Sequence, residues 1–109
     1  TATAAVELQA NAKKRTAASI GQFGEEDLYR FTAVRDGRYR IDTRGPTDIV
    51  MKLFGPNSQT ALIAEDDDSG VDTNALISTD LVAGDYFVQV RHYNRASGKG
   101  KYSIKVARL

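Results

Sequence analysis

The sequence contains no cysteine, and this absence excludes disulfides, thiolate catalysis and cysteine-ligated metals. No apolar run approaches the roughly 20 residues that a membrane-spanning helix needs, so we expect no membrane span. Lys and Arg number 15 against 14 Asp and Glu, and a net charge of only +1 does not indicate a nucleic-acid-binding protein. The 109 residues are the size of one ordinary domain, and we expect a single core.

Motifs that would support catalysis are also scarce. His92 is the sole histidine, and no Gly-x-Ser-x-Gly elbow, phosphate-binding loop or zinc motif occurs. A hydrolytic triad would therefore have no base other than His92. The paired carboxylates of a glycosidase are compatible with the composition, but a domain this small offers little room for a substrate cleft. We predict that the chain is not an enzyme.

The sequence does have a period-two alternation of apolar and polar residues, which is typical of half-buried strands. The alternation is clear in "DLYRFTAV", "GRYRIDTRG", "GDYFVQVRHY" and "GKYSIKVARL". The runs "DIVMKLF" and "TALIAED" are more continuously apolar, and "GPNSQ" between them is a turn. In "NAKKRTAASI", a helical turn and a short edge strand are both possible. About eight short strands without a convincing helix predict an all-β sandwich or barrel.

Acidic residues concentrate in the stretch "AEDDDSGVDTN". Five carboxylates fall within eight positions there: Glu65, Asp66, Asp67, Asp68 and Asp72. Close carboxylates repel one another unless a cation neutralises them, and Ca²⁺ prefers hard oxygen ligands on a flexible loop. If "GPNSQ" closes a hairpin with Phe54 opposite about Ala61, Asp48 comes to lie opposite roughly Asp67. The stretch is then a calcium site, or else a solvated turn, because Asp, Ser, Gly and Asn are turn formers in their own right.

Two further charged features have weaker signals. "GEED", at residues 24–27, is a second acidic cluster, which we interpret as a turn that leads into a strand. From Leu53 to Val90 there is no Lys or Arg, whereas the chain from Arg91 onward has no acid. The final basic hairpin could contact an anionic polymer, although Lys and Arg on exposed strands also protect sheet edges.

The run "GDYFVQVRHY" places Phe87, Arg91 and Tyr93 on its polar side. Aromatic and Arg side chains supply much of the energy at protein interfaces, so these three residues form a candidate binding surface. The alternative is that Phe87 packs under a loop, since singly exposed aromatics are common.

Five motifs follow one another in an order that resembles a known family. They are an Asp-x-Tyr-x-Phe strand at residues 27–31, a Gly-x-Tyr strand at 37–39, Asp48 before the central hairpin, the acidic loop at 66–68 and an Ala-Gly-x-Tyr strand at 83–86. This order resembles the bacterial pre-peptidase C-terminal domain family, which includes the collagen-binding domains of clostridial collagenases. The resemblance implies one domain over residues 1–109, in which 1–20 supply an N-terminal strand and a linker-like segment and 21–109 the core.

The resemblance also implies a fold and a role. The implied fold is a jelly-roll-like antiparallel β-sandwich, and the implied role is that of a non-catalytic accessory module of a secreted hydrolase, in most cases a peptidase. Such modules often bind calcium, here at Asp48, Asp66, Asp67 and Asp68, to which Asp72 is a candidate addition. They are secreted and aid export or attachment to a substrate or matrix, so the partner is a parent catalytic domain or an extracellular protein or polymer. A stand-alone secreted protein, such as a peptidase inhibitor or regulator, is the alternative.

Overall fold

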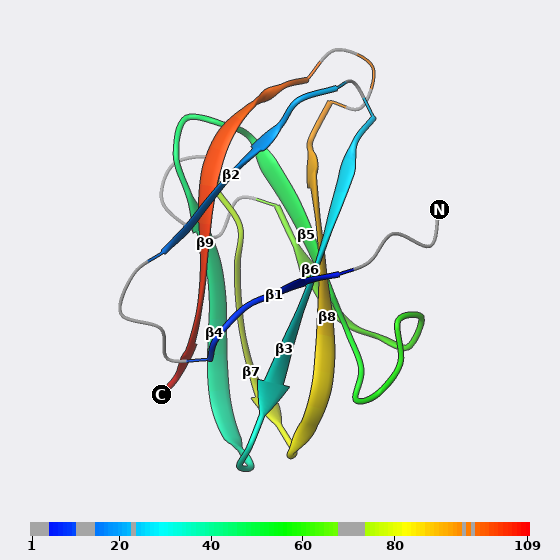
Figure 1. Cartoon of the computed structure of the whole chain (residues 1–109), viewed down its shortest axis with the longest axis vertical. Coiled ribbons are helices and arrows are strands. Elements are labelled where there is room, and N and C mark those ends of the chain that lie inside the picture. The colour runs from blue at the N-terminus through cyan, green and yellow to red at the C-terminus, as the bar shows by residue number, and fades with distance from the viewer. Residues whose placement is uncertain (1–4, 11–14, 23, 68–73, 95, 97) are drawn as a thin grey trace.

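A computed structural model describes residues 5–10, 15–22, 24–67, 74–94, 96 and 98–109 of the chain. This part of the chain contains nine strands and no helix, arranged as two facing sheets (Figure 1). The predicted all-β sandwich is therefore confirmed, with one strand more than the eight expected. None of the described residues belongs to a helix that could cross a membrane.

The larger sheet has five strands in the order β1-β3-β8-β5-β6. Their bounds are Val6–Glu7 for β1, Glu26–Ala33 for β3, Gly84–His92 for β8, Ile49–Phe54 for β5 and Leu62–Asp66 for β6. All neighbours pair antiparallel except β1 and β3, which are parallel.

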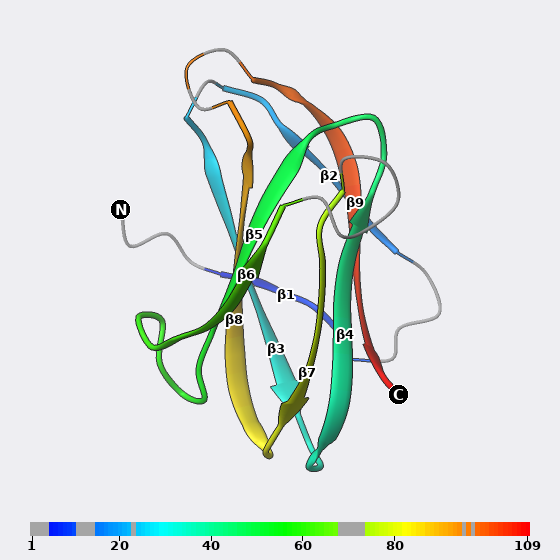
Figure 2. The same ribbon diagram turned by 180° about the vertical axis from the view of Figure 1, so that it is seen from behind.

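The smaller sheet has four antiparallel strands in the order β2-β9-β4-β7. Their bounds are Thr16–Ile20 for β2, Gly100–Arg108 for β9, Gly37–Arg44 for β4 and Leu76–Leu81 for β7. In "NAKKRTAASI" the edge-strand alternative is thus correct for residues 16–20, whereas residues 11–14 lie outside the described part. Figure 2 shows the side of the sandwich on which β6 and β7 are the outer strands of their sheets.

The core lies between the sheets and follows the alternation of the sequence. Inward side chains of seven strands are buried, whereas β1 and β6 contain no buried residue. Phe31 on β3 stacks on Tyr86 of β8 with ring centroids 5.6 Å apart. Buried tyrosines need a partner for the hydroxyl group. Tyr39 donates to the Arg35 carbonyl at 2.8 Å, and Tyr86 donates to the Val82 carbonyl at 2.7 Å.

The N-terminal segment closes one side of the sandwich. After β1, the Leu8 amide donates to the Arg30 carbonyl of β3 at 2.7 Å, and the Leu8 side chain enters the core. Two residues later Ala10 bridges to Val106 on β9, in the other sheet. Figure 1 shows β1 crossing the front of the molecule between the two layers. This segment therefore joins both sheets on the side opposite to β6 and β7.

The central hairpin has a different register from the predicted one. Phe54 pairs with Leu62, a bulge follows between Leu53 and Phe54, and Met51 pairs with Asp66. The Phe54–Leu62 pair is one residue away from the expected partner Ala61, and the bulge adds one more residue to β6, so beyond the bulge the register differs from the expected one by two residues. Continued along the strands, this register places Val50 rather than Asp48 opposite Asp67, so the predicted position of Asp48 is wrong.

Candidate functional site

The acidic end of β6 is built into the junction between the two sheets. Glu65 lies opposite Lys52 on β5, and the Asp66 carboxylate accepts the backbone N–H of Leu76 on β7 at 2.9 Å. This hydrogen bond joins the outer strand of one sheet to the outer strand of the other. Asp66 thus has a structural contact whether or not a cation binds nearby.

A cavity of about 310 Å³ adjoins these acids. Its lining combines two groups that the sequence analysis treated separately: Val50, Glu65, Asp66, Asp67, Arg91 and Tyr93. The Arg91 guanidinium donates from Nη1 to the carbonyls of His92 and Tyr93, at 3.0 and 3.2 Å. Its Nε is buried without a hydrogen-bond partner among the described residues. The structure therefore forms a pocket of mixed charge, with an exposed Tyr93 at its rim.

The described residues bring together only part of the expected calcium ligands. Asp66 and Asp67 are adjacent to the pocket, while Asp48 is half-buried and its backbone carbonyl accepts the N–H of Tyr93 at 2.8 Å. Asp68 and Asp72 lie outside the described residues. Within the described ranges, no three carboxylate or imidazole side chains converge to hold a metal ion. A cation bound in the pocket itself would also face the positive charge of Arg91.

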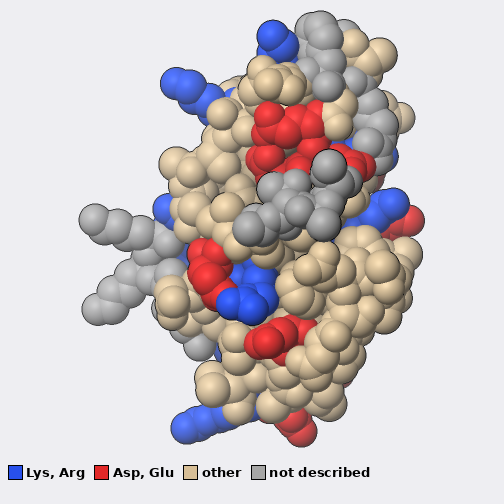
Figure 3. Space-filling model, turned by 45° about the vertical axis from the view of Figure 1, so that its right-hand side comes forward, with Lys and Arg blue, Asp and Glu red and all other residues tan. Residues whose placement is uncertain are grey.

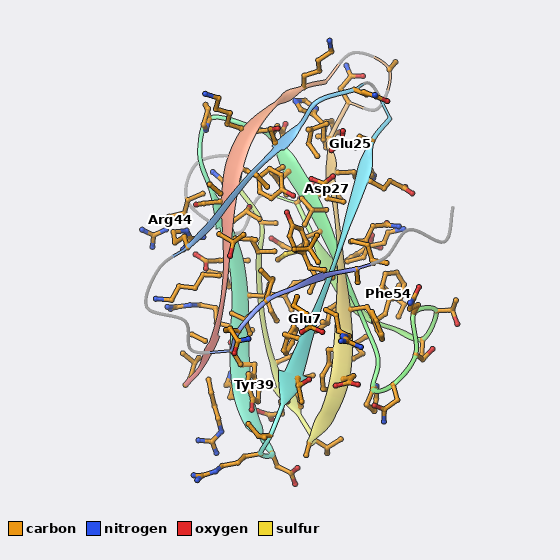
Figure 4. The ribbon with its side chains drawn as sticks, in the orientation of Figure 1. Glu7, Glu25, Asp27, Tyr39, Arg44 and Phe54 are labelled. Atoms are coloured by element: carbon orange, nitrogen blue, oxygen red, sulfur yellow. The ribbon has the colours of Figure 1, made fainter. Side chains whose placement is uncertain are left out.

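The candidate binding surface divides into two parts. Phe87 lies opposite Phe54 on β5 and Arg30 on β3, on the outer face of the five-stranded sheet. Arg91 is four residues further along β8, which corresponds to roughly 13 Å. Phe87 is half-buried, and Figure 4 shows its cross-strand neighbour Phe54 beside the hairpin. Phe87 and Arg91 therefore share β8, Tyr93 follows the end of this strand, and the three residues do not form one contact patch.

A second polar site, which the sequence analysis interpreted as a turn, lies where β3 begins. Asp27 accepts the hydroxyl proton of Tyr102, on the other sheet, at 2.6 Å, and Tyr29 and Tyr102 have hydroxyl oxygens 2.5 Å apart. Since the Tyr102 hydroxyl donates its only proton to Asp27, Tyr29 must be the donor in the hydrogen bond between the two tyrosines. The Glu25 carboxyl accepts the Gly21 N–H at 3.1 Å and shares a hydrogen bond with Asp27. Figure 4 shows Glu25 and Asp27 close together at the upper end of β3.

The two carboxyls of this site share one proton near neutral pH. Burial, and then the hydrogen bond with Glu25, raises the pKa of Asp27 to about 7. The same hydrogen bond lowers the pKa of Glu25. Burial also raises the pKa of Tyr102, which therefore remains a neutral donor. Protonated Asp27 thus donates to ionised Glu25, in a chain of hydrogen bonds that links β3 to β9.

One signal in the sequence could have revealed this site. The alternation of "DLYRFTAV" places Asp27 on the same face as Tyr29 and Phe31, which point into the core. A carboxyl on an inward position must find a hydrogen-bond partner or a neutralising charge. In the space-filling view, acidic side chains gather over the upper part of the molecule (Figure 3).

Together, the fold and the polar sites define a small β-sandwich module with its acidic groups near the ends of its strands. The family model of the bacterial pre-peptidase C-terminal domain matches residues 25–92, which is more than half of the chain. The chain belongs to this family, as the sequence motifs predicted. The family is one of non-catalytic accessory modules that typically follow the peptidase domain of secreted enzymes. No curated protein sequence matches the chain.

Solved structures share the fold at low sequence identity. The pre-peptidase C-terminal domain of a collagenase from Bacillus anthracis matches with a TM-score of 0.76 and 16% identity over 94% of each chain. PliG from Salmonella Typhimurium, a periplasmic inhibitor of g-type lysozyme, matches with a TM-score of 0.57 and 18% identity, over 94% of this chain and 97% of its own. The PliG of Aeromonas hydrophila matches with a TM-score of 0.50 and 19% identity, over 94% of this chain and 99% of its own. At these identities the matches establish a common fold.

Proposed function

We propose that this domain is a non-catalytic accessory module of an exported bacterial hydrolase, most often a peptidase in this family. The observation that carries the proposal is the family match over residues 25–92, together with the fold shared with a collagenase module over 94% of each chain. The module is secreted or periplasmic, and its partner is the parent catalytic domain or an extracellular protein or polymer. Expressing the parent enzyme with and without the domain tests this role. Loss of export, or of activity on insoluble but not soluble substrate, is expected; unchanged export and activity would contradict it.

Calcium stabilisation at the acidic loop is the second part of the proposal. The ligands are proposed to be Asp48, Asp66, Asp67, Asp68 and Asp72. The hydrogen bond from Leu76 to Asp66 supports a stabilising role, because a cation next to Asp66 would strengthen the junction between β6 and β7. Since only the folded state would hold these ligands together, calcium should raise the unfolding temperature.

Thermal unfolding with calcium and with a chelator tests this site. We expect calcium to raise the midpoint of the parent protein, and Asp66→Asn and Asp68→Asn to lose most of the increase. Asparagine at position 66 retains the oxygen that accepts the Leu76 N–H, so a lost response reports the charge. Asp80→Asn is the matched control, because the Asp80 carboxylate is exposed and lies near the end of β7 that is remote from Leu76 and Asp66. If calcium has no effect on the parent, or Asp27→Asn alone removes the effect, the acidic loop is not the site.

Contacts through Phe87, Arg91 and Tyr93 are the third part, in which Arg91 and Tyr93 line the pocket and Phe87 is a separate contact on β8. Tyr93 is exposed beside the pocket, and Arg91 and Phe87 are partly exposed on the same strand. Retention of a fluorescent fusion on insoluble protein measures attachment. We expect Tyr93→Ala and Arg91→Gln to reduce retention. Val34→Ser is the control, because Val34 is 81% exposed in the β3–β4 turn, and this variant should be retained like the parent. Equal retention of all variants would remove this surface from the proposal.

A stand-alone secreted inhibitor or regulator is the second candidate. The observation in its favour is the fold shared with the Salmonella inhibitor over nearly the whole of both chains. Titration of the domain into lysis assays with a g-type lysozyme, and into assays with secreted peptidases, distinguishes the candidates. Stoichiometric inhibition supports the inhibitor, whereas full activity at excess domain supports the accessory module.

A further inference from the structure

We propose that the outer face of the four-stranded sheet binds an anionic polysaccharide. Neighbouring residues on β4 and β9, such as Tyr39, Ile41, Tyr102 and Ile104, are buried, so the residues between them point outward. Among the described residues, this face carries six cationic side chains and two acids. We name it the basic face: Arg15, Arg38, Arg40, Arg44, Lys101 and Lys105, with Asp42 and Asp80.

The two acids compensate only part of the positive charge. Asp42 is 8% exposed and is covered by Arg15 and Arg44, with N···O distances of 3.3 and 3.7 Å. Asp80 pairs with Arg38 at 3.4 Å. The other three cations, Arg40, Lys101 and Lys105, form no ion pair with any described residue. Six cations against two acids leave a net charge of about +4 on one flat surface.

The opposite face of the molecule does not have this excess. On the five-stranded sheet, Arg30 forms an ion pair with Glu7, and Lys52 lies opposite Glu65. Figure 3, which views that sheet obliquely, shows basic and acidic side chains next to one another. The positive charge of this nearly neutral chain is therefore concentrated on one face. A general preference of Lys and Arg for the protein surface would place cations on both faces and does not explain this distribution.

The surroundings of the cations favour a polysaccharide over other polyanions. Among the described residues, the basic face exposes no aromatic side chain, because Tyr39 and Tyr102 are buried in the core. Stacking on the bases of single-stranded nucleic acid and insertion into a lipid surface both rely on aromatic or apolar side chains. Duplex DNA is also disfavoured, because a four-stranded sheet is broader than the helix or two-stranded ribbon that enters the DNA major groove. The hydroxyl groups between the cations, on Ser19, Ser78 and Ser103, suit the hydroxyls of a sugar chain.

The geometry of the basic face allows several contacts with one extended chain. Outward side chains repeat roughly every 6.6 Å along a strand, and neighbouring strands are roughly 4.8 Å apart. At one end, a cavity of about 340 Å³ has a lining that includes two of the cations: Arg44, Gly45, Pro46, Lys101, Tyr102 and Ser103. A guanidinium and an ammonium at this hollow can hold a carboxylate or sulfate while the sugar ring occupies the space. Each exposed contact is weak, so binding depends on several of them at once.

Affinity measurements with dextran sulfate and polygalacturonate test the proposal, with neutral dextran as the uncharged probe. The variant Arg40→Gln, Lys101→Gln, Lys105→Gln removes the three cations that form no ion pair with a described residue. The matched variant Arg30→Gln, Arg35→Gln, Lys52→Gln removes three cations from other surfaces and leaves the same net charge. Thermal unfolding of both variants verifies folding. We expect the parent protein to bind both anionic probes, and this binding should weaken as salt is added. The first variant should bind about tenfold more weakly, because each cation contributes a factor of about two to three. The second variant should bind with nearly the affinity of the parent.

Other outcomes would overturn the proposal. No binding of the parent protein to either anionic polymer at low salt would exclude the ligand class. Equal losses in the two variants would mean that net charge, and not the basic face, drives binding. Tighter binding to a DNA duplex or to anionic lipid vesicles than to the polysaccharides would identify a different partner. The inference rests on the charges of this face and not on the accessory-module role, so a failure of either leaves the other standing.

Discussion

Replacing Asp27 by Asn should stabilise the calcium-free protein at alkaline pH and leave its stability at acid pH nearly unchanged. Burial and the neighbouring Glu25 raise the pKa of Asp27 to about 7, whereas the same carboxyl in the unfolded chain titrates near 3.9. Between these values the folded protein holds more protons than the unfolded chain. The free energy of unfolding therefore falls as pH rises from about 4 to about 7 and is then constant. Asn cannot ionise, and its carbonyl oxygen still accepts the proton of Tyr102.

The magnitude follows from the size of the shift. The pKa rises from 3.8 to about 7, and roughly three pKa units correspond to an upper limit of about 4 kcal/mol. Asp27 is partly exposed, so solvent screening reduces this limit, and its titration is shared with Glu25. We expect a gain of about 1–2 kcal/mol at pH 8.5, or about 5–10 °C in the unfolding midpoint of a domain of this size. Glu25 affects stability in a different pH range, because its pKa is lowered in the folded protein. Ionised Glu25 stabilises the folded state, and this stabilisation is lost as pH falls below about 4.5.

Urea unfolding followed by circular dichroism, at pH 5.0 and pH 8.5 with chelator, measures the effect. Asp80→Asn is the control, because it also removes one carboxylate but from an exposed position. The parent protein and Asp80→Asn should both be less stable at pH 8.5 than at pH 5.0, whereas Asp27→Asn should lose most of this difference. A parent whose stability is flat between these pH values, or an Asp27→Asn variant destabilised equally at both, would refute the proton-sharing pair.

Three further substitutions test the packing. Phe31→Ala should reduce the free energy of unfolding by about 3–5 kcal/mol, because this fully buried ring stacks on Tyr86; a loss below about 1 kcal/mol in urea unfolding would contradict the core assignment. Arg15→Met should lower the free energy of unfolding by about 1–3 kcal/mol, because Asp42 then loses one of its cationic partners. The effect of Arg15→Met should be smaller in an Asp42→Asn background, and additive effects of the two substitutions would show that the two residues do not interact. Gly45→Ala should lower the unfolding midpoint, since φ is +131° and an added Cβ would lie 3.0 Å from the Lys101 carbonyl oxygen; an unchanged midpoint would rule out this close approach.

The strands could be predicted because their signal is local. In "DLYRFTAV" and "GRYRIDTRG", every second residue is apolar, and the structure buries Tyr29, Phe31, Tyr39 and Ile41. Burial on one face of a pleated strand requires this period, so neighbouring residues alone carry the information. The order of the motifs likewise identified the family correctly.

The pairing of the central hairpin needed more than the local pattern. The position of the turn was correct, but Phe54 pairs with Leu62, one residue beyond the expected partner, and the bulge between Leu53 and Phe54 shifts the register by one residue more. An irregularity of this kind depends on how β5 fits between β6 and β8, which the residues of the hairpin do not encode separately. Asp48 consequently lies away from the position opposite Asp67, while Arg91, assigned to a different surface, lies beside Asp67 instead.

By itself, then, the sequence determined the all-β class, the inward and outward sides of most strands, and membership of the pre-peptidase C-terminal domain family. These properties follow from the spacing of apolar side chains and from motifs of a few residues. Only the tertiary structure decided that Asp27 meets Tyr102, that Arg91 joins the acidic end of β6, and that the cations of β4 and β9 form one face. Each of these contacts joins residues about 25 or more positions apart, because the two sheets are assembled from strands distant in the chain.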